Sequence, residues 1–266
     1  MKKYIYLLFV LSLLMFGCAQ QYGTTPGQDD YGGEDSDESG RAVFTVTDVA
    51  ADMGSVSSIK VTVDSVRVHS EAEGWVTLTT DDKTVDLLQL KASGNQALLA
   101  DVQLEQGTYD QVRLDISEVV VTDAEGEHDA KLPSGELKIM GDLQVNAQST
   151  STASFDFIAH ESLHITGEGK YILAPVVQFQ TKENVTVTIA SANDVRIQGG
   201  MTTTNVRVGM NANGQVGVGL GIPANVDISV TGGQIRVGSS VGVGIGNRAE
   251  ENSNSADADV DVGISY

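Results

Sequence analysis

Residues 58–70 read SIKVTVDSVRVHS, and apolar and polar side chains alternate along almost the whole stretch. Isoleucine or valine recurs at nearly every second position, which is the side-chain period of a β-strand with one face toward a core. The same alternation occurs at 42–46 (AVFTV), 75–80 (WVTLTT) and 107–122 (GTYDQVRLDISEVVVT). These segments are rich in valine, isoleucine and threonine, so we expect half-buried strands.

Further apolar segments continue this pattern. A strand is predicted at 84–90 (TVDLLQL), and a short helical turn within 92–104, where alanine and leucine replace β-branched residues. Strands are also expected at 143–147, 152–158 and 171–181. Short strands about ten residues apart, with turn residues between them, are typical of a β-sandwich. The sequence therefore predicts an all-β fold, an antiparallel β-sandwich followed by a glycine-rich β extension.

The chain begins MKKYIYLLFVLSLLMFGCAQQ, which has the composition of a lipoprotein signal peptide. Two lysines precede an apolar run at 4–16, which is shorter than the roughly 20 residues that a membrane-spanning helix needs. The run ends at Gly17 and Cys18, which resemble a lipobox, so residues 1–18 are interpreted as the signal and Cys18 as the lipid attachment site. Cys18 is the only cysteine, which rules out an internal disulfide. The alternative is an uncleaved N-terminal anchor with an incidental thiol.

Both flanks of the chain are acidic. Residues 19–40 contain almost nothing apolar, so we expect a disordered acidic tether between membrane and domain. Residues 250–266 are interpreted as an acidic tail or edge strand. The net charge of −20 argues against nucleic acid as a partner, because phosphate contacts need clusters of lysine and arginine. It also argues against the protein body lying on an anionic membrane.

Several segments occur in an order that resembles one known family. They are VTDVAAD (46–52), VRVHSEAEGWVTL (66–78), VDLLQL (85–90), GTYDQVRLDI (107–116), LPSGELKI (132–139), FDFIAHESL (155–163) and GKYILAPVV (169–177). Together they resemble domain of unknown function 4382, found in exported and lipid-anchored proteins of archaea and bacteria. The resemblance covers about residues 41–183 and implies an extracytoplasmic β-sandwich without an established activity. Ala50 departs from it, because the family has proline at this position of a TDxP turn.

The sequence HESLH, which begins at His160, has the H-E-x-x-H form of zinc peptidases. In those enzymes the motif lies on a helix, so that two imidazoles such as His160 and His164 bind zinc while Glu161 acts as a base. Here strand-like residues precede it and glycines follow it. Lys170 stands where the extended motif has its third histidine, and Glu183, at another known ligand distance, falls at the far end of a predicted strand. The motif is interpreted as a structural loop, with a zinc peptidase as the alternative.

Other candidate sites are weaker. Asp257, Asp259 and Asp261 have the spacing of a calcium loop, but glycine stands one position late and the sequence has no glutamate at the twelfth position, so a solvated acidic segment is preferred. Asn184 begins an Asn-Val-Thr glycosylation sequon.

Two histidines and two aromatic residues remain to be placed. His69 and His128 are expected in hairpin turns at the surface. Trp75 and Tyr109 are expected to be aromatic anchors of the core, with an exposed platform for stacking sugars as the alternative. No signature of a Ser/His/Asp triad, a phosphate-binding loop or a dinucleotide site is present in the sequence.

The composition becomes glycine-rich after residue 183. Short repeats mark this region: DVRIQGG (194–200), NVRVG (205–209), QIRVG (234–238), VGVGLG (216–221) and VGVGIG (241–246). Strands with glycine on one face permit close backbone approach. Residues 184–249 are therefore predicted to form a sheet attached to the sandwich; a short solenoid-like stack and part of a membrane barrel are the alternatives. A boundary at residue 183 implies that residues 41–183 fold without the remainder.

These observations favour an exported protein, anchored by a lipid on Cys18 to the outer face of a membrane. Its function is predicted to be a binding or structural role at the cell envelope, with an envelope protein or a glycan as the ligand. No cofactor and no catalytic residue are predicted. The alternative function is a zinc metallopeptidase that uses His160, Glu161 and His164.

Overall fold

The computed structural model describes residues 38–49, 52–224 and 226–238. Cys18 and the aspartates at 257, 259 and 261 lie outside these residues. Contacts divide the chain into two units, Met1–Ser36 and Asp37–Tyr266, and every described residue belongs to the second. No helix among the described residues has the length and apolar character needed to cross a membrane.

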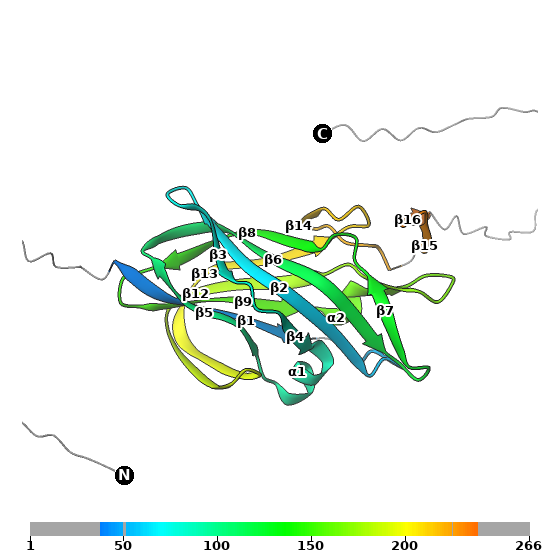
Figure 1. The fold of residues 1–266 in the computed structure, drawn as a ribbon, viewed down its shortest axis with the longest axis horizontal. Helices are drawn as coiled ribbons and strands as arrows, with labels where there is room; N and C mark the ends of the chain where they lie inside the picture. Colours follow the sequence, from blue (N-terminus) through cyan, green and yellow to red (C-terminus); the bar gives the residue numbers. More distant parts are fainter. Residues whose placement is uncertain (1–37, 50–51, 225, 239–266) are drawn as a thin grey trace, which may run out of the picture. The chain divides into compact units, whose positions relative to one another are not determined.

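The first layer is a six-stranded sheet that contains β1 (Figure 1). Every side chain of β1 is buried or half-buried. The alternating, β-branched segments of this sheet have the pattern expected for strands that cover a core. In spatial order the strands are β14 (Val216–Val218), β13 (Asp194–Met210), β12 (Val176–Ser191), β9 (Thr150–Phe157), β1 (Ser39–Asp48) and β5 (Ala97–Glu105).

The second layer is an eight-stranded sheet that contains the opening segment 58–70 as β2. Its main path runs through β10 (Leu163–Ile165), β11 (Tyr171–Leu173), β7 (Glu127–Lys131), β6 (Gly107–Thr122), β2 (Ser58–Ser70) and β3 (Gly74–Thr79), while β4 (Lys83–Asp86) pairs with β2 and β8 (Glu136–Val145) pairs with β6.

The predicted all-β class is confirmed, but the sheets are mixed rather than purely antiparallel. β1 runs parallel to β9, and β7 runs parallel to β11. Between β1 and β9 the chain forms most of the second sheet, and this long crossover returns β9 in the direction of β1. Parallel neighbours need such a crossover, whereas a tight hairpin can only join antiparallel strands.

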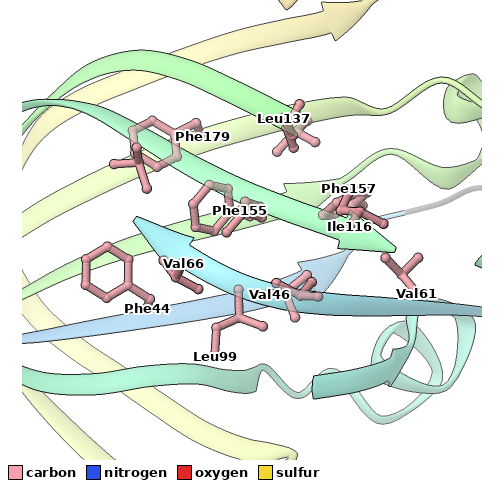
Figure 2. Close-up of a cluster of buried hydrophobic side chains, with 14 of the residues drawn as sticks. Phe44, Val46, Val61, Val66, Leu99, Ile116, Leu137, Phe155, Phe157 and Phe179 are labelled. Atoms are coloured by element: carbon pink, nitrogen blue, oxygen red, sulfur yellow. The ribbon is translucent and has the colours of Figure 1, made fainter. Parts of the chain in front are cut away.

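A single hydrophobic core fills the space between the two layers. Figure 2 shows aromatic side chains of the first sheet meeting aliphatic side chains of the second. Phe155 and Phe179 lie on neighbouring strands with ring centroids 5.1 Å apart, and both are fully buried. The other large buried side chains include Phe44, Phe157 and Leu99 from the first sheet and Ile59, Tyr109, Leu114, Leu137, Ile139 and Leu143 from the second.

The strand predicted at 84–90 is wrong in its second half, where helix α1 (Leu87–Ser93) begins. Asp86 is the reason, because its carboxylate accepts hydrogen bonds from the backbone N–H groups of Leu88 and Gln89 and caps the helix. Gly94 ends the helix in the left-handed conformation, with φ of 66°. The predicted helical turn within 92–104 is therefore displaced toward the N-terminus.

The structure places no boundary at residue 183, because β12 runs without interruption from Val176 to Ser191. β13 pairs with β12 along nearly its full length, so the start of the glycine-rich region completes the first sheet. The tip of this hairpin bends round to β5, where the N–H of Leu98 donates to Ala192 O at 2.7 Å (Figure 1). The hairpin β15 (Asp227–Thr231) and β16 (Gln234–Gly238) forms a separate small sheet, and Ile228 and Ile235 pack against Ile172 and Ala174 of the sandwich.

Candidate functional site

A pocket of about 1070 Å³ lies between edge strands of the two sheets. β10 is the edge strand of one sheet and β14 is the edge strand of the other, and residues of both line the pocket. Three apolar side chains of the lining are open to solvent: Ile165 at 56%, Val218 at 77% and Leu220 at 40%. Exposed apolar side chains around a concavity mark a binding site for an apolar ligand or partner.

The HESLH motif forms part of this pocket, but it is not the loop that the sequence predicts. Helix α2 (Ala159–Ser162) carries His160 and Glu161 and is a single turn long, and His164 already belongs to β10. The hydroxyl of Ser162 fixes this turn, since it donates to Ile158 O at 2.8 Å and accepts from the N–H of Val176 at 2.8 Å. The two histidines therefore leave different elements instead of one face of a helix.

The carboxylate of Glu161, at the rim of the pocket, lies between the side chains of Arg207 and His160. The guanidinium of Arg207, on β13, donates to its carboxylate. Nε2 of His160 lies 3.8 Å from the other oxygen of the same carboxylate. Among the described residues no group of three or more His, Cys, Asp or Glu side chains has an arrangement that could hold a metal ion. The arrangement is that of an ion-paired rim beside an apolar pocket.

His164 lines the same pocket and has one buried polar atom with no hydrogen-bond partner among the described residues. Burial lowers the pKa of His164, although a hydrogen bond to the backbone of Glu161 opposes this shift, so the ring is neutral at neutral pH. Nε2 is buried and has no hydrogen-bond partner in the described structure, which leaves Nδ1 to bond Glu161. In a neutral ring whose Nδ1 donates to a carbonyl, Nε2 is an acceptor. This acceptor is therefore buried beside the pocket and is not open to it.

The far wall of the pocket comes from residues that sequence reasoning did not assign to any site. Arg207, residues 218–224, Val226 and Ile228 supply it. Gly209 allows the wall to close, because a Cβ atom there would lie 2.0 Å from the carbonyl oxygen of Leu220. The signal in the sequence was the VGVGLG repeat, which predicted close backbone approach but not its location.

The other described residues that the sequence singled out as candidates lie outside the lining of this pocket. His69 and His128 lie in β2 and β7 instead of hairpin turns, and each is half-buried beside an aspartate, Asp110 at 2.8 Å and Asp123 at 3.0 Å. Tyr109 is a core anchor, as predicted. Trp75 is not, because it is 39% exposed on the outer face of the second sheet.

Glu183 and Asn184 lie well away from the HESLH turn. Glu183 is seven residues along β12 from Val176, a distance of roughly 23 Å, and it accepts a hydrogen bond from Asn146 at 2.7 Å. Asn184 is exposed in a left-handed conformation, with φ of 54°, and its side-chain oxygen accepts from the hydroxyl of Ser149.

Comparison with known proteins gives one family. A family described as domain of unknown function (DUF4382) matches residues 39–175, just over half of the chain. The protein is a member of the DUF4382 family. No curated protein and no solved structure matches the chain. The DUF4382 match includes α2 and β10, with His160 to Ile165, but ends before Arg207 and the other residues of the far wall.

Two carboxyl groups, Asp48 and Asp156, lie near the ends of the neighbouring strands β1 and β9 in this DUF4382 protein. Asp48 is buried and accepts a hydrogen bond from the N–H of Ala159, the first residue of α2, at 3.1 Å. Asp156 is half-buried and lines a polar cavity of about 190 Å³ together with Gln96 and Lys182. Burial, and then the charge of Asp48, raise the pKa of Asp156 from 3.8 to about 6. The folded protein therefore binds this proton more tightly than the unfolded chain does.

We expect Asp156→Asn to stabilise the protein at neutral pH. A carboxyl whose pKa is raised by folding stabilises the folded protein fully at pH values below its unfolded pKa of 3.8. This stabilisation is lost as the pH rises through the folded pKa of about 6. Because Asp156 is only half-buried, solvent reduces the gain to about 1 kcal/mol. Urea unfolding at a series of pH values should show that the variant loses less stability between about pH 4 and pH 6. Glu118→Gln, at an exposed position of β6, is the control; equal pH profiles for both variants and the original chain would contradict the assignment.

Proposed function

We propose that this DUF4382 protein is a lipid-anchored, extracytoplasmic β-sandwich module that binds an apolar ligand at the cell envelope. The observation that carries the binding role is the pocket of about 1070 Å³ between the edge strands β10 and β14. Burying apolar surface there gives roughly 25 cal/mol for each Å² removed from water. The exposed side chains of Ile165, Val218 and Leu220 supply such surface at the mouth of the pocket.

The polar groups of the pocket narrow the class of ligand. Arg207 and Glu161 neutralise each other at the rim, so no single charge is available to hold an ionic ligand. Nε2 of His164 is buried and adds no accessible polar group to the pocket. An uncharged ligand with an apolar body fits this combination, because its binding takes no charge out of water.

The same contacts favour binding over zinc-dependent hydrolysis. A peptidase of the H-E-x-x-H class needs its glutamate free to activate a metal-bound water. Here Glu161 is engaged by Arg207, and His160 and His164 lie on different elements.

The pocket is tested with a neutral dye whose fluorescence rises in apolar surroundings, Nile red. The measurement uses a protein that begins at Asp37, which retains every described strand. Because this protein lacks the proposed lipid attachment site Cys18, it can be purified without detergent. We expect saturable enhancement with this protein and its loss in Val218→Asp, because a carboxylate at the pocket mouth repels an apolar ligand. Met201→Asp, at a position 61% exposed on β13 outside the pocket lining, should bind like the parent. Equal dye binding by both variants would overturn the proposed site.

The anchor is tested separately in the full chain. The sequence motif that supports it is the single cysteine after an apolar run and a glycine. Expressed in a host that processes lipoproteins, the full chain should incorporate labelled fatty acid and sediment with membranes. Cys18→Ala should lose the label and remain unprocessed or become soluble. Retention of label and processing in Cys18→Ala would refute the anchor without affecting the pocket.

A further inference from the structure

A flat set of side chains, here called the Trp75 platform, covers the outer face of the eight-stranded sheet. It consists of residues that stand directly opposite one another on β3, β2, β6 and β8. One row holds Trp75, His69, Gln111 and Met140, and the adjacent row holds Thr77, Arg67, Arg113 and Lys138. Neighbouring strands are about 4.8 Å apart, so each row spans roughly 14 Å. This is the length of a short linear ligand.

Trp75 is fixed on this platform with one face covered. The guanidinium carbon of Arg113 lies 4.2 Å from the centre of its ring, within the range of a cation–π contact. The ring of His69 lies 5.1 Å away at an angle of 56°. Arg113 is only 17% exposed whereas Trp75 is 39% exposed. The indole therefore covers the Arg113 guanidinium, has the guanidinium carbon of Arg67 5.9 Å from its ring centre, and still leaves more than a third of the residue's surface exposed.

The two arginines of the platform are ion-paired with carboxylates that lie beside it. Arg67 donates to both carboxylate oxygens of Asp115, at 2.9 and 2.6 Å, and Arg113 donates to Glu136 at 2.6 Å. Arg67 and Arg113 face each other across β2 and β6, so these two carboxylates neutralise two adjacent cations. The side chains are held in place before any ligand arrives, which lowers the entropy cost of binding.

We propose that the Trp75 platform is a binding site for a neutral oligosaccharide. The C–H face of a pyranose ring carries partial positive charge, which suits the negative π-face of an indole. The carboxylates of Glu136 and Asp110, 40% and 38% exposed, accept hydrogen bonds from sugar hydroxyls. The ligand is neutral because Arg67 and Arg113 are already paired and because the net charge of −20 repels acidic polysaccharides, although Lys138 is exposed at the end of one row. This site is separate from the pocket at β10 and β14 and does not depend on it.

The chain offers a direct readout, because Trp75 is its only tryptophan. The protein that begins at Asp37 is titrated with cellohexaose, mannohexaose and chitohexaose while its tryptophan fluorescence is followed. We expect a saturable change with at least one of these sugars. Calorimetry then compares variants: Trp75→Ala should weaken binding roughly tenfold, and Trp75→Phe should lose less because it keeps a π-face. Met201→Ala, on the other sheet, is the control and should bind like the parent.

Three results would overturn the proposal. One is the absence of a saturable fluorescence change with all three hexaoses. A second is unchanged affinity in Trp75→Ala, which would place the sugar elsewhere. The third is tighter binding of an acidic chain such as a hyaluronan hexamer, which would contradict the charge argument. Thermal unfolding shows whether each variant is folded. If Trp75→Ala is unstable, the affinity of Trp75→Phe for the hexaose is compared with that of the parent instead.

Discussion

Phe155→Ala should destabilise the protein by about 3–5 kcal/mol. Phe155 lies on β9 in the middle of the first sheet, is fully buried, and packs against Phe179 with ring centroids 5.1 Å apart. Truncation removes the transfer free energy of the ring and leaves a cavity between two sheets that cannot close over it. Since domains of this kind are stable by about 5–15 kcal/mol, the loss is a large share of the total.

Chemical denaturation of the protein that begins at Asp37 measures this loss. The control is Val49→Ala, at a position 59% exposed just after β1, which should change the free energy of unfolding by less than about 0.5 kcal/mol. A loss below about 1 kcal/mol for Phe155→Ala would show that the two sheets do not pack around this ring as described.

Ending the chain after Glu183 should abolish cooperative folding, although the sequence predicted a domain boundary there. The cut removes the second half of β12 and all of β13 and β14. β13 supplies the buried side chains Val208 and Met210 to the core, and Val208 stands opposite Val177 of β12. It also supplies Thr204, whose hydroxyl donates to Asp142 O of the second sheet at 3.0 Å. Without β13 the buried core is open, and β12 becomes an unpaired edge.

The matched control is a chain that spans residues 37–238, because it keeps every described strand. Circular dichroism, thermal unfolding and gel filtration distinguish the two proteins. We expect a cooperative transition and a monomer for residues 37–238, and aggregation or a broad transition for residues 37–183. A monomeric, cooperatively unfolding protein of residues 37–183 would restore the boundary that the sequence predicted.

Sequence reasoning placed the strands because their signal is local. Alternation in segments such as 58–70 reports which side chains face a core, and this holds whatever the neighbouring strands are. The same signal could have placed Trp75 correctly, since in WVTLTT it shares a face with Thr77 and not with the half-buried Val76 and Leu78. The expectation that a tryptophan belongs in the core outweighed the pattern. For α1, the cap at Asp86 decided the element, and the apolar run after it carried no period that favoured a helix.

By itself, the sequence determined the all-β class, most of the strands and the DUF4382 relationship. Only the tertiary structure decided that β1 runs parallel to β9, that β12 continues past residue 183, and that β10 and β14 end at one pocket. It alone brought Arg207 to Glu161, 46 residues apart. The physical reason is that strand pairing joins segments far apart in the chain through backbone hydrogen bonds that any sequence can make. Periodicity tells which face of a strand is buried, whereas the choice of neighbours depends on how the whole chain closes its core.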